Sequence, residues 1–203
     1  MTRITSLEEL RALYPPAHER ALKKQLSHLD RHCRRFIELS PFLAISSMGQ
    51  DGLGDVSPRG DQPGFVHVTD DHTLLIPDWP GNNRLDTLSN ILANPNVGLL
   101  FLIPGVDEVL RVNGMAELHA GETLRAPFVR SGKLPRLVVK VRVREAYLHC
   151  AKALMRSKLW DPAARIVRSA LPTMNEMMRD QTESTDAVEP QDEMVARYRT
   201  VLY

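Results

Sequence analysis

Residues 74–101 read LLIPDWPGNNRLDTLSNILANPNVGLLF, and this stretch says the most about the fold. The apolar residues before Pro77 indicate a strand, and a turn rich in proline and glycine follows. A helix is expected to open with Asn82, Asn83 and Arg84, and a second turn then leads into another apolar strand. A helix start carries unpaired backbone N–H groups and a partial positive charge, and an arginine there can bind phosphate. The stretch therefore predicts a phosphate-binding corner on a β scaffold.

The composition points to an ordinary globular protein. The chain has 203 residues, enough for one substantial core with extra helices at the ends. A net charge of +1 provides no overall field that would favour nucleic acid or a membrane surface. Two cysteines make no disulfide framework, and no apolar run at the N-terminus resembles a signal peptide. No window approaches the roughly 20 apolar residues that cross a bilayer. We expect a cytoplasmic protein.

The middle of the chain is expected to be mostly β, because short apolar or alternating runs are separated by turn residues. Turns rather than helices join most of these runs, which favours an antiparallel barrel over a parallel sheet. The fold class is therefore mainly β with flanking helices. Six or so strands are predicted from the segments 42–47, 55–59, 65–68, 73–76, 97–103, 109–119 and 137–148.

Helices are expected at both ends, over about 6–39 and over a tail of about 151–203. Ser6 begins a capping-box pattern, which predicts a short first helix. Apolar residues at helical intervals then predict one continuous amphipathic helix from Ala17 to Leu39. We find no internal repeat and no domain boundary, so residues 1–203 are expected to form a single domain.

Three arginines are candidates for binding an anion. Arg59 lies in the segment DVSPRGD, with Ser57 on the same strand face, and Arg84 lies at the expected helix start. Arg111 belongs to the polar face of its strand. These arginines could converge on one phosphorylated ligand. Alternatively, they are solvated surface arginines paired with acidic neighbours, a common and nearly neutral arrangement, the candidate partners being Asp61, Asp86 and Glu108.

Other polar residues provide weaker signals. His28 and His32 have a spacing that could bind a metal, but no third ligand is evident, so packing histidines are favoured and no metal site is predicted. His149 and Cys150 could form an activated thiol, but a buried cysteine is the more common arrangement. No catalytic residue can be assigned.

The order of these motifs resembles a known family. A strand ending in SPRG, then LLIPDWPGNNRLDTLSNILANPNVGLLF, then VLRVNGMAEL are similar to the pyridoxamine 5'-phosphate oxidase-type flavoproteins over roughly residues 42–118. The run HCAKALMRSKLW is similar to the tail of an uncharacterised branch. The resemblance implies an antiparallel, Greek-key-like split β-barrel that binds FMN at a homodimer interface.

The resemblance also implies roles for individual residues. The early-strand arginine and the residues of the turn would hold the FMN phosphate, and the backbone before the turn would face the flavin ring. A tryptophan in the tail would reach the cofactor or the opposite subunit. The implied FMN-binding residues are Ser57, Arg59, Leu75, Ile76, Pro77, Asn82, Asn83, Arg84, Arg111 and Trp160.

Two departures from the family pattern limit the expected activity. Asn83 stands where the best-known members carry a second basic residue, and the segment VARYRTVLY lacks the Arg-Leu-x-Pro type of motif of the true oxidases. We therefore expect an FMN-dependent oxidoreductase that acts on another small-molecule substrate or electron donor, with no nucleic-acid or membrane partner. The alternatives are a non-catalytic flavin-binding, storage or sensing protein, or the same barrel binding a deazaflavin or haem.

Overall fold

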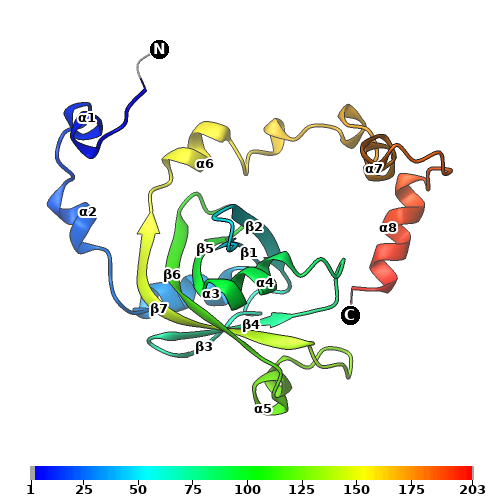
Figure 1. Ribbon diagram of the computed structural model, residues 1–203, viewed down its shortest axis with the longest axis horizontal. Helices are drawn as coiled ribbons and strands as arrows, with labels where there is room; N and C mark the ends of the chain where they lie inside the picture. The colour runs from blue at the N-terminus through cyan, green and yellow to red at the C-terminus, as the bar shows by residue number, and fades with distance from the viewer. Residues whose placement is uncertain (1–2, 203) are drawn as a thin grey trace.

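The computed structural model describes residues 3–202, so the first two residues and the last residue of the predicted tail lie outside it. Its centre is a strongly bent sheet of seven antiparallel strands (Figure 1). The order across the sheet is β2-β1-β5-β6-β7-β4-β3. The strands are β1 Phe42–Met48, β2 Gly54–Gly60, β3 His67–Asp70, β4 Thr73–Asp78, β5 Asn96–Leu102, β6 Val109–His119 and β7 Leu137–His149. This confirms the predicted antiparallel, mainly β fold.

The core lies inside the bend of the sheet and is closed by two helices. Alternation along β1 buries Leu43 and Ile45, while β5 contributes Leu99 and Phe101 to the same core. Helix α4 (Asp86–Ala93) closes one opening with Leu88 and Ile91. Helix α3 (Arg31–Leu39) packs Cys33, Phe36 and Ile37 against the same cluster.

The two longest strands, β6 and β7, pair along the full length of β6 and change register at one bulge, between Asn113 and Gly114. A Cβ atom on Gly114 would lie 2.3 Å from the carbonyl oxygen of Arg142. Only glycine therefore fits at this position, because the opposing strand approaches too closely for a side chain.

The N-terminal segment differs from the single long helix that the periodicity predicts. Helix α1 (Leu7–Ala12) does begin with the predicted capping box at Ser6. The predicted continuous helix over 17–39 is wrong, because the chain forms α2 (Glu19–Lys23) and α3 with an extended segment between them.

Two local interactions interrupt that helix. Leu26 forms a β-bridge with Ala146, in which the two backbone N–H groups donate at 3.0 and 2.8 Å. The Asp30 side chain then accepts hydrogen bonds from the backbone N–H groups of His32 and Cys33, which starts α3 as an independent helix.

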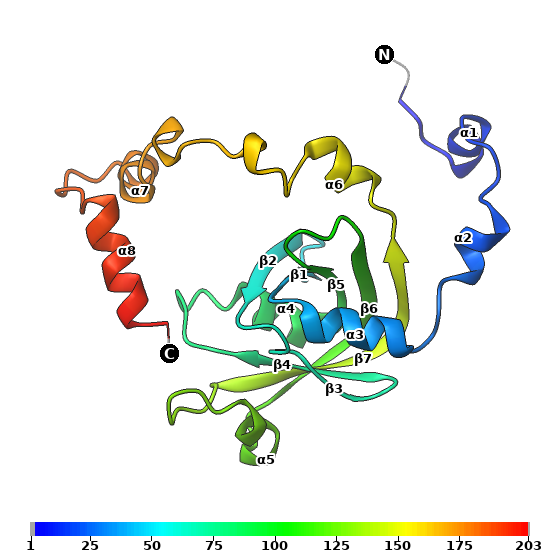
Figure 2. The same ribbon diagram turned by 180° about the vertical axis from the view of Figure 1, so that it is seen from behind.

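The remaining helices lie outside the barrel. Helix α5 (Glu122–Arg125) and the 3₁₀ turn Ala126–Phe128 cover a second small apolar cluster under β7. After β7 the chain forms α6 (Lys152–Ser157), two 3₁₀ turns, α7 (Met174–Thr182) and α8 (Gln191–Thr200). Helix α6 lies beside the sheet, where Ala153 and Leu154 line a hollow with strand residues. Helices α7 and α8 stand clear of the sheet, as do α1 and α2 at the other end (Figures 1 and 2). Within residues 3–202, no helix is long and apolar enough to cross a membrane.

Candidate functional site

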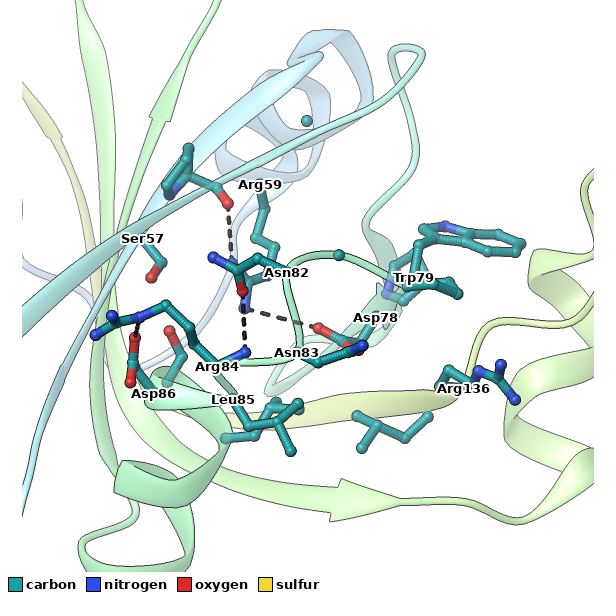
Figure 3. Close-up of a pocket in the computed structure, with 18 of the residues that line it drawn as sticks. Ser57, Arg59, Asp78, Trp79, Asn82, Asn83, Arg84, Leu85, Asp86 and Arg136 are labelled. Atoms are coloured by element: carbon teal, nitrogen blue, oxygen red, sulfur yellow. Dashed lines mark hydrogen bonds and ion pairs between the residues drawn. The ribbon is translucent and has the colours of Figure 1, made fainter. Parts of the chain in front are cut away.

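A cleft of about 670 Å³ opens between β2, the end of β4, the turn after β4, the first turn of α4 and the start of β7 (Figure 3). This volume lies within the range of small-molecule sites. Strand β2 is one edge of the sheet, and β4 lies next to the opposite edge. The cleft therefore forms where the two ends of the bent sheet approach each other.

The turn between β4 and α4 has an unusual backbone. The Asn82 side chain accepts a hydrogen bond from the backbone N–H of Arg84 at 3.1 Å, and both Asn83 and Leu85 adopt left-handed conformations, with φ of 58° and 61°. Helix α4 consequently begins at Asp86. The prediction that the helix opens with Asn82, Asn83 and Arg84 is wrong, because a left-handed Leu85 cannot belong to a right-handed helix.

The corrected turn still suits an anion. Leu85 caps α4 without a side-chain hydrogen bond, so the first N–H groups of the helix are not satisfied by a capping side chain. Thr87 and Leu88 of that first turn line the cleft. Arg84 adds a full positive charge, although its Nε already donates to the Asp86 carboxylate at 2.8 Å. A bound anion would have to share Arg84 with Asp86.

Arg59 reaches the cleft from β2. One of its guanidinium nitrogens donates to the backbone carbonyl of Pro58 at 2.9 Å, and another lies 3.7 Å from the Asp78 carboxylate. The Asp78 side chain is only 16% exposed. Burial raises the pKa of the Asp78 carboxyl, while the nearby Arg59 acts in the opposite direction. The cleft thus contains a second arginine whose charge is partly offset by an acid.

Asp55 organises the hydroxyl groups beside the turn. Its Oδ2 accepts from the hydroxyls of Ser57, Thr87 and Ser47 at 3.4, 3.3 and 3.5 Å. A hydroxyl has a single proton to donate. In this arrangement Ser57 presents oxygen lone pairs to the cleft, so it cannot donate to a phosphate until its bond to Asp55 is broken.

The side of the cleft away from Arg84 has both apolar and charged side chains. Pro77, Trp79 and Leu137 line it, and Arg136 lies beyond Asp78 on the side away from Arg84 (Figure 3). The cleft therefore combines a basic turn with flat and apolar side chains, and Arg136 adds a positive charge on the side away from that turn. This arrangement suits a ligand that has both an anionic group and an aromatic ring.

The structure brings together only part of the predicted set. The predicted residues that line the cleft are Ser57, Arg59, Pro77, Asn82, Asn83 and Arg84. Leu75 and Ile76 are instead buried, with exposures of 4% and 1%, in two different apolar clusters on either side of β4. Of the three backbone positions predicted to face a ring, only Pro77 lies at the cleft.

Arg111 and Trp160 lie elsewhere. Arg111 projects from the outer face of β6 into a separate hollow of about 470 Å³, with its guanidinium 5.1 Å from the centre of the Tyr147 ring. The Trp160 indole N–H donates to the backbone carbonyl of Val106 at 2.9 Å. Within one chain, neither residue lines the cleft that Arg59 and Arg84 line.

Sequence reasoning missed several residues of the cleft. Asp78 and Trp79 follow directly after the predicted strand, so their position in the stretch 74–101 could have identified them. Asp55 begins the segment DVSPRGD, two residues before Ser57 on the same strand face. Arg136 had no local signal, because only the pairing of β7 with β4 brings it to the cleft.

The weaker candidates do not form a site in the structure. His28 stacks edge-on against His72 at 6.2 Å, and the residues described contain no cluster of three or more potential metal ligands. Burial raises the pKa of the Cys33 thiol to about 12, which makes it unreactive. Cys150, expected to be buried, is exposed beside the Arg111 hollow.

The split sheet, the basic turn and the strand order agree with one protein family, whose model, described as pyridoxamine 5'-phosphate oxidase, matches residues 29–150. The chain belongs to the pyridoxamine 5'-phosphate oxidase family. The match covers the whole sheet, α3 and α4, and therefore the cleft. It stops at the end of β7, before the C-terminal helices.

Solved structures share this fold at low sequence identity. A variant of HupZ from Group A Streptococcus is 15% identical, with a TM-score of 0.51 over 60% of this chain and 99% of that one. A candidate pyridoxamine 5'-phosphate oxidase from Lactobacillus delbrueckii is 19% identical, with a TM-score of 0.47 over 61% and 98%. HutZ, the heme storage protein from Vibrio cholerae, is 15% identical, with a TM-score of 0.42 over 59% and 94%. No curated protein matches the chain. The likeness to HupZ concerns the fold alone and leaves the ligand open.

Proposed function

We propose that this member of the pyridoxamine 5'-phosphate oxidase family binds FMN in the cleft and acts as an FMN-dependent oxidoreductase. One observation carries the proposal: Arg59, Arg84 and the left-handed turn before α4 line the same cleft. Two guanidinium groups and a helix N-terminus are suited to a phosphate. The wall formed by Pro77 and Trp79 is suited to a flat ring.

Different residues of the cleft would contact different parts of FMN. The Asn82–Arg84 turn and the first N–H groups of α4 would bind the phosphate, and Arg59 would close on it from β2. Asp86 and Asp78 would weaken this grip, since each lies against one of the two arginines. Hydride or electron transfer is the chemistry that a bound flavin supplies, so no general base of the protein is required.

Arg111 could take part only across a homodimer. Its hollow lies on the outer face of the sheet, whereas the cleft lies at the split between β2 and β4. If Arg111 approaches the flavin, as the resemblance implies, it must come from a second copy of the chain. The proposed homodimer therefore brings the Arg111 hollow of each chain to the cleft of its partner.

The first experiment is the absorption spectrum of the purified protein together with the mass of any co-purified ligand. A flavin spectrum, or tight binding in an FMN titration, is expected. A colourless protein that binds no FMN would rule out the proposal. A haem or deazaflavin spectrum would assign the cleft to another cofactor instead.

A second experiment separates an enzyme from a storage or sensing protein. The FMN-loaded protein is mixed with NADH or NADPH in a stopped-flow instrument, and reoxidation by candidate acceptors is then followed. Repeated turnover with any donor and acceptor supports an oxidoreductase. Binding of FMN without reduction by a broad set of donors would support the non-catalytic alternative.

A further inference from the structure

The C-terminal segment after the family match forms an arm that stands off the barrel. We call residues 151–202 the arm. Near its root, the Trp160 indole N–H donates to the carbonyl oxygen of Val106, which fixes the direction in which the arm leaves the barrel. Beyond this point, α7 and α8 are clearly separated from the sheet in both views (Figures 1 and 2). The arm therefore cannot contribute much to the core of its own barrel.

The outer half of the arm is nevertheless folded. Thr173 forms a capping box with Glu176 at the start of α7. The Asn175 side chain donates to the Glu189 carbonyl oxygen at 3.1 Å, and Arg197 of α8 pairs with the Glu189 carboxylate at 2.8 Å. These contacts hold α7 and α8 together as one unit, so the arm has a definite shape that another surface can recognise.

The arm also exposes apolar side chains that water disfavours. Ile166 and Val167 are 70% and 72% exposed. Five further apolar side chains of the arm are 46% to 61% exposed, namely Met155, Leu159, Leu171, Met174 and Met178. Its helices have only 6 to 10 residues, and isolated helices this short are marginal in water. Ile166 and Val167 lie in the link between the two 3₁₀ turns, whereas Met155, Met174 and Met178 lie on these short helices. Exposed apolar side chains of this kind mark a surface that is covered in the working protein.

The total accessible surface area of the chain indicates how much surface a partner could cover. The chain exposes 14254 Å². A compact monomer of its 22.9 kDa mass would expose about 9,600 Å², so the excess is roughly 4,700 Å². A standard interface buries only about 800 Å² on each partner. The N-terminal helices α1 and α2 also lie apart from the sheet and contribute to this excess, so it is an upper limit on the area that a partner covers, and it leaves room for an extensive interface.

We propose that the arm of each chain packs on the barrel of a second copy, so that two chains exchange arms in a dimer. The barrel offers the matching surface, because Phe42, Val56 and Leu100 are exposed together on the outer face of β1, β2 and β5. Ala153 and Leu154 at the root of the arm line the same hollow as that face. Each chain has both an arm and an outer barrel face. In a two-fold dimer, the arm of each chain can therefore cover the barrel face of the other.

The charge of the arm favours a protein surface over other partners. The arm has equal numbers of basic and acidic side chains. Over its whole length it therefore has no net charge to attract nucleic acid or an anionic membrane, although five of its eight basic side chains lie in residues 152–168. The proposal rests on the homodimer part of the proposed function, and it does not depend on the identity of the cofactor.

The decisive test asks whether an arm contacts its own barrel or that of a partner. Unlabelled and ¹⁵N-labelled full-length chains are co-refolded in equal amounts and cross-linked through lysines. Links from Lys158 in the arm to Lys140 of β7, or to Lys24 at the end of α2, which donates to the carbonyl of Leu148 in β7, are then sorted by mass. About half of these links should join a light chain to a heavy chain. Links only within one isotope would show that each arm covers its own barrel, and would overturn the proposal.

A second test uses native protein and needs no refolding. The double variant Ile166→Asp/Val167→Asp changes side chains that are exposed in the single chain, so the barrel should remain folded. It should weaken the dimer about tenfold or more in sedimentation velocity experiments. The matched control Ser169→Asp/Ala170→Asp adds the same charges to exposed neighbours and should leave the dimer intact. Wild-type dimerisation of the Ile166→Asp/Val167→Asp variant would contradict the exchanged arm.

The two proposals can fail separately. A dimer that binds FMN but shows only same-isotope links removes the exchanged arm and leaves the flavin site. A dimer with mixed-isotope links that binds no FMN removes the flavin site and leaves the arm.

Discussion

Arg59 and Asp78 face each other across 3.7 Å inside the cleft, with side chains that are only 24% and 16% exposed. Arg59 belongs to β2, at one edge of the sheet, and Asp78 ends β4, next to the opposite edge. The two strands are not neighbours, so this ion pair spans the split between the two ends of the sheet. The same ion pair therefore bridges the two ends of the sheet and sets part of the charge in the candidate site.

Replacing Asp78 by Asn should change the pH dependence of stability. The pKa of this carboxyl is raised in the folded protein, mainly by burial. A raised pKa means that Asp78 supports folding fully below its unfolded pKa and that this support is lost as the pH rises through the folded pKa. Relative to wild type, Asp78→Asn should therefore become progressively more stable as the pH rises through that window.

Urea unfolding at a series of pH values, from about pH 3.5 to pH 7, measures this difference. Asp180→Asn, which removes an exposed carboxylate on α7, is the control. A stability difference for Asp78→Asn that shrinks as the pH rises would mean that the Arg59 charge outweighs burial at Asp78.

Arg84→Ala should weaken FMN binding about tenfold or more, because it removes a charged hydrogen bond to the phosphate. The double variant Arg59→Ala/Arg84→Ala should nearly abolish binding. Quenching of FMN fluorescence in a titration measures both. Arg35→Ala, which removes an exposed arginine on α3, is the control. Wild-type affinity in the double variant would show that the phosphate binds elsewhere.

Asp86→Asn should have the opposite effect on binding. The Asp86 carboxylate accepts from Arg84 Nε at 2.8 Å and competes with a bound phosphate. Its removal should strengthen FMN binding by about threefold, the scale of an exposed ion pair. The same change removes an acid from the first turn of α4 and should slightly lower stability. Titration and thermal unfolding of one sample record both effects; weaker FMN binding would show that Asp86 positions Arg84 for the ligand.

Gly114→Ala should destabilise the fold by about 1–3 kcal/mol, because the new methyl group overlaps the backbone of β7. A Cβ there would lie 2.3 Å from the Arg142 carbonyl oxygen, and backbone cannot move away as a side chain can. Gly54→Ala is the matched control, since a Cβ at this strand position meets nothing within 4 Å. Chemical denaturation of both variants measures the difference. Equal stability would show that the β6–β7 bulge can relax.

The β part of the fold could be predicted because its signals are local. Strands such as β1 and β6 alternate buried and exposed residues, and the turns between strands carry glycine and proline. The single long helix over 17–39 was predicted wrongly, because the helical periodicity reflects only the local sequence and a long-range contact interrupts the helix at Leu26. Leu26 forms a β-bridge with Ala146, and no sequence pattern near Leu26 predicts a contact with a residue so distant in the chain.

In the candidate site too, local features were predicted and features that depend on long-range contacts were not. Asn82, Asn83 and Arg84 were identified as a basic turn, and they do line the cleft with Arg59. Their backbone was not predicted, because the left-handed conformation of Leu85 depends on how the turn must join β4 to α4. The position of Arg111 on another face likewise depends on the bend of the sheet.

By itself, the sequence determined the strands, the antiparallel class, the basic turn and the family resemblance. Each of these depends on residue types at short spacings, where local sterics and hydrophobic periodicity dominate. Only the tertiary structure decided that Asp78 lies against Arg59, that Arg111 points away from the cleft, and that the arm leaves the barrel. These features depend on long-range strand pairing and on surface that one chain leaves uncovered, and neither is encoded in any short stretch of residues.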